Sequence, residues 1–143
     1  MQQRVTVSGF IYDNGKVLIL KRGAQETFLA NHWEVPGGKL EYGEDPIVGA
    51  LREVKEEAGI DCEVLCIHHT WGAVNDYRGQ KTHFVEICFI MKMKPNQKVV
   101  VGDGMADAKW ISKNELSNYL MSPEMKKEIE SGFKWVNNHA AFG

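Results

Sequence analysis

The chain has 143 residues, of which 43% are hydrophobic, and its 17 Lys and Arg against 19 Asp and Glu give a formal net charge of -2. This length and composition predict one globular domain over residues 1–143 and argue against a separate cofactor-binding domain. The nearly balanced charge argues against a nucleic-acid polymer as a partner, because such binders depend on clustered Lys and Arg.

The cysteine content and the lack of long apolar runs bear on the location of the protein. Cys62, Cys66 and Cys88 are odd in number and form no Cys-x-x-Cys pair, which is typical of a reducing compartment. No apolar run approaches the roughly 18 residues of a membrane span, and the first residues lack a signal-peptide core. We therefore expect a cytoplasmic protein with no membrane partner, either a monomer or a homodimer.

The first half of the chain predicts a β-hairpin, a loop and a helix. Alternating apolar residues over 5–12 and 17–20 flank Asn14-Gly15, which suits the positive φ angles of a tight turn. Residues 23–32 resemble a loop, and 33–35 a short strand that Pro36-Gly37-Gly38 ends. A helix is expected over 46–58, because Asp45 is a good N-cap, Pro46 suits the first helical position and Gly59 suits a left-handed C-cap.

The second half predicts further strands and two more helices, so we expect a mixed α/β domain. A capping box, Ser112-x-x-Glu115, opens the second helix, and Ser122-Pro123-Glu124 opens a third that runs towards Asn137. The expected strands are 62–71 and 82–93, joined by an exposed polar loop at 74–79, then an edge strand at 99–101 and a strand at 108–111.

The helix over 46–58 has two contrasting faces. A wheel at about 100° per residue places an apolar stripe, predicted to be the core face, opposite a set of carboxylates. Gly49 lies on the acidic side, where it is expected to leave space above the carboxylates. The stripe consists of Ile47, Leu51, Val54 and Ala58, and the acidic face of Glu53, Glu56 and Glu57.

Negative charge is concentrated around this helix. Residues 38–60 hold six acids and three bases, or 3 − 6 = −3, which leaves 14 − 13 = +1 for the rest of the chain. Three carboxylates at i, i+3 and i+4 repel one another, and a hard divalent cation removes that repulsion because it prefers oxygen ligands. Arg52 beside them suits the task of pairing with one carboxylate and orienting it.

These residues fit the pattern Gly-x5-Glu-x7-Arg-Glu-U-x-Glu-Glu-x-Gly-U, where U is aliphatic, from Gly38 to Ile60 without a departure. The sequence therefore resembles the Nudix hydrolases. The run Ala30-Asn31 to Glu41 further resembles the Ala-Asn-x-x-Glu-x-Pro-Gly-Gly-Lys-x-Glu approach of MutT-type members, and Trp110 followed by Glu115-Leu116 resembles the family's usual ending.

The resemblance implies a fold and a metal site. Nudix proteins are α/β/α sandwiches with a mixed sheet and a catalytic strand-loop-helix, and they hydrolyse a diphosphate bond in a nucleoside diphosphate linked to another group. By this resemblance Glu53, Glu56, Glu57 and the Gly38 carbonyl would bind Mg²⁺ or Mn²⁺, with Glu53 activating the attacking water and Arg52 holding Glu53 in place.

The resemblance also suggests residues that bind the substrate. Lys39 and Arg22 lie where the family presents basic side chains to phosphates, Glu34 would contact the substrate or support the metal site, and Glu44 would support the start of the helix. A further acid often joins the metal site in this family, with Asp103, Asp107 and Glu86 as candidates; the alternative for Glu86 is a position on the solvent side of its strand. Trp33, Phe28, Trp71 and Tyr77 are candidates for stacking on a base or for the core, whereas Trp110 and Trp135 are assigned to the core and His32, His68, His69 and His83 to structural or surface positions.

The leading hypothesis is a MutT-type enzyme that converts a nucleoside triphosphate, including oxidised ones, to a monophosphate and pyrophosphate. Alternatives are a dinucleoside polyphosphate hydrolase, because Tyr77 lies 17 residues beyond Ile60, and an ADP-ribose pyrophosphatase, although the proline common there is absent. A silent Nudix domain that senses a nucleotide is the non-enzyme alternative. Selection of the base would involve residues 23–31, 72–81 and 120–125.

Overall fold

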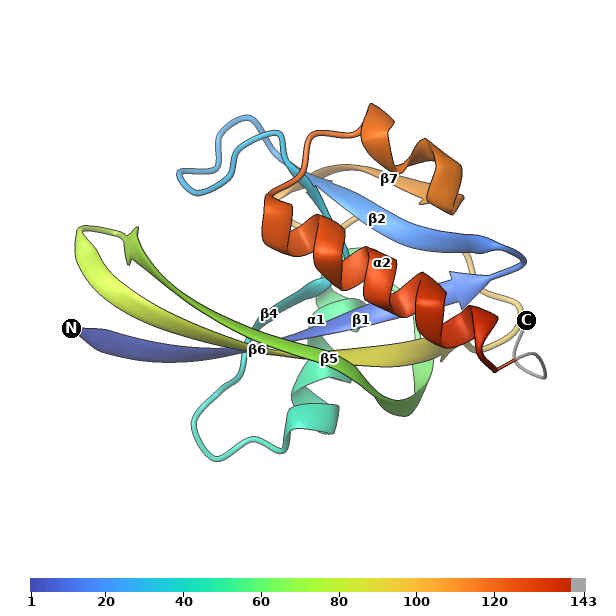
Figure 1. Cartoon of the computed structure of the whole chain (residues 1–143), viewed down its shortest axis with the longest axis horizontal. Helices are drawn as coiled ribbons and strands as arrows, with labels where there is room; N and C mark the ends of the chain where they lie inside the picture. Colours follow the sequence, from blue (N-terminus) through green and yellow to red (C-terminus); the bar gives the residue numbers. More distant parts are fainter. Residues whose placement is uncertain (140–143) are drawn as a thin grey trace.

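The computed structural model describes residues 1–139. The chain forms a mixed sheet with one α-helix on each side, which confirms the expected mixed α/β class (Figure 1). No helix within residues 1–139 is long and apolar enough to cross a membrane. In chain order the elements are β1 (Gln2–Asp13), β2 (Lys16–Arg22), β3 (Trp33–Glu34), β4 (Gly37–Lys39), α1 (Pro46–Ala58), β5 (Cys62–Tyr77), β6 (Gln80–Met93), β7 (Met105–Ile111), the 3-10 helix η1 (Lys113–Asn118) and α2 (Pro123–Asn137).

The sheet combines parallel and antiparallel pairs. Its main order is β3-β2-β1-β6-β5, with β4 added to β1 and β7 added to β2. The pair β1–β6 is parallel over ten residues, from Gln2 opposite Thr82 to Ile11 opposite Met91, and every other pair is antiparallel. Because parallel neighbours need a long connection, α1 and β5 fit between these two strands in the sequence.

Alternation along β1 and β2 divides the core between the two faces of the sheet. Phe10 and Ile19 pack under α2, whereas Val7, Ile11 and Leu18 pack under α1. Successive residues of a strand point to opposite faces, so the apolar runs of these two strands supply both layers. The sandwich of α1, sheet and α2 follows from this double-sided burial (Figure 1).

The strands β1 and β2 separate soon after the turn that joins them. They pair only at Tyr12–Val17 and Asp13–Lys16, next to Asn14 and Gly15, whose φ angles of 47° and 83° confirm the expected tight turn. Farther along, β1 pairs with β4 and β2 pairs with β3. The short strands β3 and β4 therefore lie where the sheet opens, and the expected strand at 33–35 ends at Glu34 instead.

The helix α1 has the ends that the sequence predicted. The Asp45 carboxylate accepts hydrogen bonds from the backbone N–H groups of Ile47 and Val48, Pro46 is the first residue, and Gly59 has a φ of 69°. The core face differs from the predicted one at two positions. Ile47 is 45% exposed, because the first turn extends beyond the sheet, and Gly49 is buried against Leu40 and Glu44 instead of leaving space above the acidic face.

The predicted polar loop at 74–79 is wrong. The strands β5 and β6 continue through this segment to a turn at Arg78 and Gly79, which have φ angles of 51° and 78°. Pairing extends to Tyr77 opposite Gln80, and β1 is a third strand as far as Thr82, so the polar residues lie on an arm of β5 and β6 (Figure 1). This arm and the start of β1 form one end of the molecule.

Two smaller expectations are also corrected. Residues 99–101 form no strand, because the Val100 N–H donates to the Ala58 carbonyl and the segment covers the end of α1. The capping box is present, with the Glu115 carboxylate accepting from the Ser112 N–H and hydroxyl, but it opens a 3-10 helix. The third expected helix is confirmed as α2.

Leu20 and Leu51 allow a graded test of the core below α1. Leu20 is fully buried, whereas Leu51 packs against the same cluster and is only half-buried. We expect Leu20→Ala to lower the free energy of unfolding by about 2–5 kcal/mol and Leu51→Ala by about half as much. Urea denaturation measures both, and a larger cost at Leu51 would contradict the packing described.

His68 should make the stability depend on pH. Its ring accepts or donates at the Ser131 hydroxyl, 3.0 Å away, and burial, followed by the nearby His69, lowers the pKa of His68 from 6.5 to about 4. The unfolded chain therefore binds a proton more readily, and stability is lost as the pH falls from about 6.5 towards 4. We expect His68→Gln to remove about 1–3 kcal/mol of that loss. Thermal unfolding at pH 7.5 and 4.5, with the exposed His83→Gln as control, measures this difference.

Candidate active site

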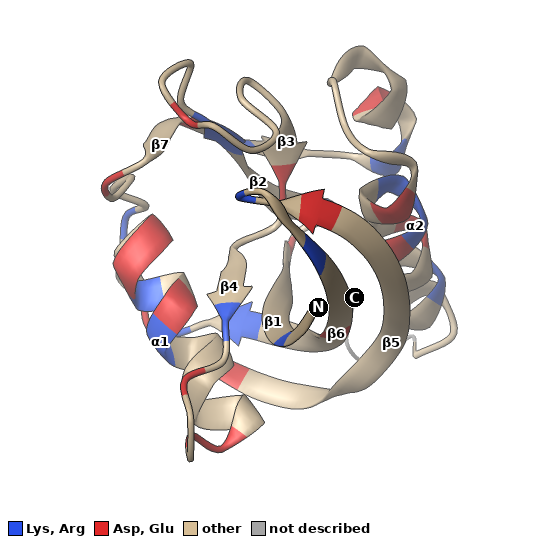
Figure 2. Cartoon of the chain, turned by 90° about the vertical axis from the view of Figure 1, so that its left-hand side faces the viewer, with Lys and Arg blue, Asp and Glu red and all other residues tan. Residues whose placement is uncertain are grey.

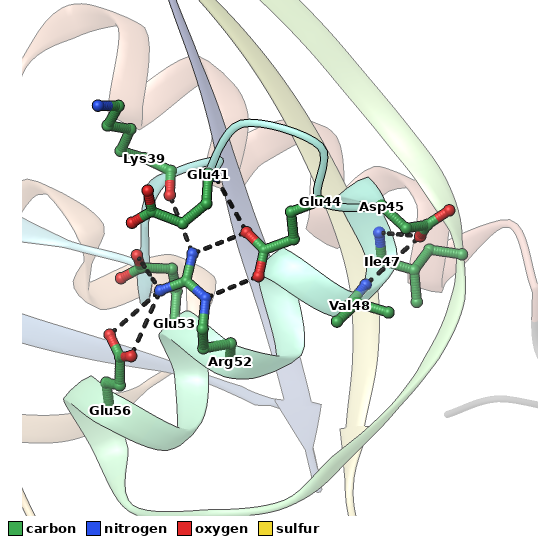
Figure 3. A network of polar contacts seen from close by, with 9 residues as sticks. All are labelled: Lys39, Glu41, Glu44, Asp45, Ile47, Val48, Arg52, Glu53 and Glu56. Carbon is green, nitrogen blue, oxygen red and sulfur yellow. Dashed lines mark hydrogen bonds and ion pairs between the residues drawn. The ribbon is translucent and has the colours of Figure 1, made fainter.

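Arg52 lies at the centre of a network of polar contacts on α1 (Figure 3). Its Nε and Nη2 atoms donate to the two oxygens of Glu44 at 2.8 and 2.9 Å, and Nη2 also donates to the Lys39 carbonyl at 3.1 Å. Its Nη1 donates to Glu53 at 2.9 Å and, more weakly, to Glu56 at 3.3 Å. The rigid guanidinium thereby ties the loop before α1 to the acidic face of the helix.

Two of the three acidic residues of α1 meet the glycines of β4. The Gly37 N–H donates to Glu57 at 2.9 Å. A Cβ atom at Gly38 would lie 2.5 Å from an oxygen of Glu53, so a larger residue there would displace this carboxylate. Glu56 is the third, with 58% of its side chain exposed. The structure therefore brings Gly38, Glu53 and Glu57 together at the opening of the sheet and places Glu56 on its solvent side.

Burial makes the inner carboxylates poor acids. Burial, followed by repulsion from Glu34, raises the pKa of Glu57 to about 8, even though the Gly37 N–H opposes the shift. Burial also raises the pKa of Glu53 against the opposing effect of Arg52. Glu44 behaves oppositely, because its hydrogen bonds from Arg52 lower its pKa to about 2. Glu44 is thus the main partner of Arg52, a pairing that the sequence did not indicate.

This donor set fits a hard divalent cation. Glu53 and Glu57 offer carboxylate oxygens that repel each other, and a cation between them would lower the cost that burial imposes on their charged forms. The exposed Glu56 leaves one side of the group open to water or phosphate, as Mg²⁺ sites require. Glu53 and Glu57 therefore offer oxygens that suit such an ion. The ligand atoms of Glu53, Glu56 and Glu57 do not all lie within 4.8 Å of one another; within residues 1–139 that distance is met by Glu86, Cys88 and Glu128.

A cavity of about 530 Å³ begins at the glycines of β4. Gly37, Gly38 and Lys39 of β4 line it, together with the rings of Phe28, Tyr77 and Phe84, whereas Glu53, Glu56 and Glu57 are not among its lining residues. Phe28 and Phe84 are stacked, and Tyr77 meets both rings edge-on. Trp33 is buried in the core and also lines the cavity, and Trp71 lines the cavity as well. Trp110 and Trp135 were expected in the core, but they are only partly buried and pack against the edge of the core.

The predicted substrate residues line the same cavity. Arg22 donates to Glu34 at 3.1 Å and to the Phe28 carbonyl at 2.9 Å, so Arg22 and Glu34 form a pair. Burial raises the pKa of Glu34 against the effect of Arg22. Lys39 is exposed at the end of β4 and lines the cavity. Figure 2 shows β4 beside α1 with its acidic residues. The Lys39 side chain extends away from the Arg52 network (Figure 3).

The three acids proposed as additional metal ligands lie in different places. Asp103 and Asp107 are exposed, and an Asp107 oxygen accepts from the Ala108 N–H. Glu86 lines the cavity on the α2 side of the sheet, where Thr6 and Trp71 donate to it at 2.9 and 3.0 Å. The idea that Glu86 faces solvent is therefore wrong.

The sequence did not indicate two charged residues, Glu128 and Arg4, that lie on the same side of the sheet as Glu86. Glu128 is 1% exposed and accepts from Ser8 at 2.7 Å and from Trp71 at 3.1 Å. Arg4 lies with its guanidinium 4.6 Å from the centre of the Tyr77 ring. The signal that could have revealed Glu128 is its position in the apolar stripe of α2, between Met125 and Ile129.

A protein-family model described as the NUDIX domain matches residues 2–136. The chain belongs to the Nudix family. It is thus a Nudix hydrolase, and Nudix hydrolases generally use a divalent metal ion. This assignment agrees with the carboxylate set on α1.

Curated relatives with different names are similar to this Nudix chain. "Nudix hydrolase 5" of Arabidopsis thaliana is 27% identical over 94% of the chain, which spans only 44% of that protein's length. "ADP-ribose pyrophosphatase" of Methanocaldococcus jannaschii is 27% identical over 93% of the chain and 75% of the relative. "Nucleoside triphosphatase NudI" of an Enterobacter species is 26% identical over 82% of the chain and 87% of the relative.

Solved structures share the fold. A NUDIX hydrolase from Nitrosomonas europaea is similar with a TM-score of 0.73 and 25% identity, over 96% of this chain and 89% of the other. A MutT NUDIX hydrolase from Burkholderia pseudomallei has a TM-score of 0.76 at 22% identity, over 92% of this chain and 98% of the other. The expected Nudix fold with its mixed sheet is therefore confirmed.

Proposed function

We propose that this Nudix hydrolase cleaves a nucleoside triphosphate, oxidised nucleotides included, into a nucleoside monophosphate and pyrophosphate, with Mg²⁺ or Mn²⁺ as its cofactor. The observation that carries the proposal is a cavity lined both by Gly37 and Gly38, which contact the carboxylates of Glu57 and Glu53, and by the rings of Phe28, Tyr77 and Phe84. In this proposal the triphosphate lies beside the glycines, the phosphate end, and the base beside the rings, the aromatic end. The run from Ala30 to Glu41 and the likeness to a protein named a nucleoside triphosphatase support this substrate class.

The proposed roles on α1 follow from the contacts there. A divalent cation held by Glu53, Glu56 and Glu57 would neutralise phosphate charge and lower the pKa of a water molecule, so that a weak base would suffice to deprotonate it. Glu53 takes that proton, because its burial raises its pKa and thus its basicity. Arg52 positions Glu53 through the 2.9 Å contact from Nη1. Gly38, Glu56 and Glu57 complete the oxygen set.

The remaining proposed roles concern the phosphates. Lys39, exposed at the mouth of the cavity, binds a phosphate oxygen and offsets the charge that develops on the leaving pyrophosphate. Arg22 and Glu34 act as a pair, in which Glu34 fixes the guanidinium that contacts the substrate. Both groups line the cavity beside the glycines of β4.

A substrate panel tests the proposal. Nucleoside triphosphates, 8-oxo-dGTP, ADP-ribose and diadenosine tetraphosphate are incubated with Mg²⁺, and products are separated by anion-exchange chromatography. We expect monophosphate and pyrophosphate from a triphosphate, and no product when the metal is chelated. Exclusive turnover of diadenosine tetraphosphate or ADP-ribose would overturn this substrate class.

A dinucleoside polyphosphate is the second candidate, because of one feature at the aromatic end. The guanidinium groups of Arg4 and Arg78 lie 4.6 and 5.1 Å from the centre of the Tyr77 ring, and Tyr77 lines the cavity. Cationic groups on an aromatic residue can bind a second base or phosphate. ADP-ribose is a further alternative through the likeness to a protein of that name.

A nucleotide sensor without activity is the non-enzyme alternative. It would bind members of the panel and hydrolyse none. The complete set of Arg52, Glu53, Glu56 and Glu57 favours the enzyme, because binding alone needs no base held by an arginine. We also propose one Nudix domain over residues 1–143, a monomer or homodimer, in the cytoplasm, where Cys62, Cys66 and Cys88 remain free thiols.

Glu56→Gln should weaken the response to metal while leaving the fold intact. The residue is exposed and makes only long contacts with Arg52, so its loss removes one carboxylate ligand and little structure. We expect the Mg²⁺ concentration for half-maximal activity to rise about tenfold, because affinity follows the number of charged ligands. Rates measured across a Mg²⁺ titration show this shift, and identical curves would remove Glu56 from the site.

A further inference from the structure

Two carboxyl groups meet on the cavity floor, on the side of the sheet opposite α1. Glu86 of β6 and Glu128 of α2 both accept from the same Trp71 indole N–H, at 3.0 and 3.1 Å. Glu86 lines the cavity and Glu128 lies behind it, almost fully buried. Thr6 donates to the first and Ser8 to the second. Within residues 1–139 every side-chain donor to the pair is a neutral hydroxyl, indole or thiol group, the thiol being that of Cys88 at 3.9 Å from Glu86.

No salt bridge reaches either carboxyl within residues 1–139, although both lie in a largely apolar layer. The titratable or charged groups that face Glu86 from the surrounding elements are Glu128 on α2, Glu34 on β3, Cys88 on β6, His69 on β5 and Arg4 on β1. Two buried charges of like sign without a counter-ion are unfavourable, so such a pair keeps a proton. Burial and Glu128 accordingly raise the pKa of Glu86.

A carboxyl that keeps its proton is both a donor and an acceptor. This is the complement of an N–H beside a carbonyl, or of an amino group beside a ring nitrogen, and each common nucleobase has one such edge. Stability alone does not account for the pair, because well-packed apolar residues often replace buried charged groups with no loss of stability.

The register places this carboxyl at a suitable distance from the proposed phosphate end. Val7 of β1 lies opposite Gly38 of β4 on one side and opposite Ile87 of β6 on the other. Two strand spacings, about 10 Å, therefore separate the backbone of Gly38 from the backbone next to Glu86. One nucleotide can extend over this distance from phosphate to base, and the Phe28, Tyr77 and Phe84 rings stand in the same cavity to cover its faces.

We propose that the Glu86 carboxyl binds the nucleobase of the substrate as hydrogen-bond donor and acceptor, and that Glu128 behind it is the positioning residue. The inference rests on the proposed nucleotide substrate and names the residue that recognises its base. It assigns Glu86 to the base and not to the metal.

Calorimetric binding without metal tests this assignment separately from catalysis. The ligands are AMP, GMP, CMP and UMP, with ribose 5-phosphate as the base-free reference. The ratio of the Kd of ribose 5-phosphate to the Kd of the best monophosphate measures the contribution of the base. We expect Glu86→Leu to lower this ratio at least tenfold, and Glu86→Gln, whose amide also donates and accepts, to stay within threefold of the wild type.

The pH dependence tests the part of Glu128. A raised pKa means that Glu86 is neutral at lower pH and loses its donor as the pH rises through that pKa, so the wild-type ratio should fall at alkaline pH. Glu86→Gln should not show the fall, and Glu128→Gln should show it at lower pH, because the neighbouring charge is gone. Glu130→Gln, exposed on the same helix, is the matched control and should follow the wild type.

Several results would overturn the assignment. These are an unchanged ratio in Glu86→Leu, an equal loss for ribose 5-phosphate and the monophosphates, or no binding of any monophosphate by the wild type. If Glu86→Leu does not fold, the test uses Glu86→Gln. The assignment is then overturned if the ratio of Kd values falls at alkaline pH to the same extent in the wild type and in Glu86→Gln. The protein could bind the base through Glu86 and yet hydrolyse no triphosphate. That result would support this inference and contradict only the proposed reaction.

Discussion

Glu53→Gln should lower kcat by a factor of about 10²–10⁴ while leaving the fold intact. The amide has nearly the same shape and can still accept from Arg52, so the helix should not change. It cannot take a proton, and it binds a hard cation less well than the buried carboxylate does. Steady-state rates on the best substrate at saturating Mg²⁺ measure the loss, and circular dichroism checks the fold.

A matched variant separates this effect from a general loss of negative charge. Glu63→Gln changes an exposed carboxylate on β5, outside the network, and should keep the wild-type rate. A Glu53→Gln enzyme with an unchanged rate would remove this residue from the mechanism. If the rate of Glu53→Gln is lower but returns to the wild-type value at higher Mg²⁺, Glu53 is a metal ligand and not the base.

Arg52→Lys should lower activity by about 10- to 100-fold, the usual cost of removing a residue that orients a metal ligand. Lysine keeps the charge but lacks the planar group that contacts Glu44, Glu53 and the Lys39 carbonyl together (Figure 3). We expect kcat to fall more than KM rises, because Arg52 contacts the proposed base and not the substrate cavity. Initial rates measured over a range of substrate concentrations at saturating Mg²⁺ give both kcat and KM.

Lys55→Met provides the control on the same helix. Its ion pair with Asp61 is long, at 3.4 Å, and exposed, so its loss should leave the rate unchanged. Glu44→Gln should mimic part of the Arg52→Lys effect, since Glu44 holds the other side of the guanidinium. Full additivity in the double variant would show that the two residues act independently, against the network described here.

The helix with its acidic face was readable from the sequence because its signals are local. Asp45, Pro46 and Gly59 define its ends through hydrogen bonds and φ angles that involve only near neighbours. The spacing of Glu53, Glu56 and Glu57 then follows from helix geometry alone. Glu57 contacts Gly37, and Glu53 lies against Gly38, so both contacts join α1 to β4. Helix geometry did not indicate them; the resemblance to the Nudix motif did so for Gly38 and the acids.

The errors concern features that depend on distant parts of the chain. Ile47 fits the apolar stripe, but the wheel cannot tell where the sheet below the helix ends. Residues 72–81 look like a loop because they are polar, yet β6 provides a full pairing partner and Arg78-Gly79 makes the turn without the usual Asn-Gly signal. Val99–Val101 is strand-like in composition but finds its hydrogen-bond partner at the end of α1.

The pair of Glu86 and Glu128 shows the same limit at the site. The two residues are 42 positions apart, on a strand and a helix, and neither belongs to the motif that indicated the family. Their meeting depends on the register of β6 and on how α2 crosses the sheet. A buried acid within an apolar helix stripe was the one local sign available.

The arm of β5 and β6 changes how selectivity can arise in this protein. A flexible loop of ten residues would lose backbone entropy each time a ligand ordered it, at about 1–2 kcal/mol per residue fixed. Here that ordering is already complete in the free chain, since pairing reaches Tyr77 and Gln80. Inward-facing residues recur at every second position of β6, as Phe84 and Glu86 show. New preferences should therefore evolve by single substitutions at alternate positions, whereas an insertion of one residue would reverse the faces beyond it.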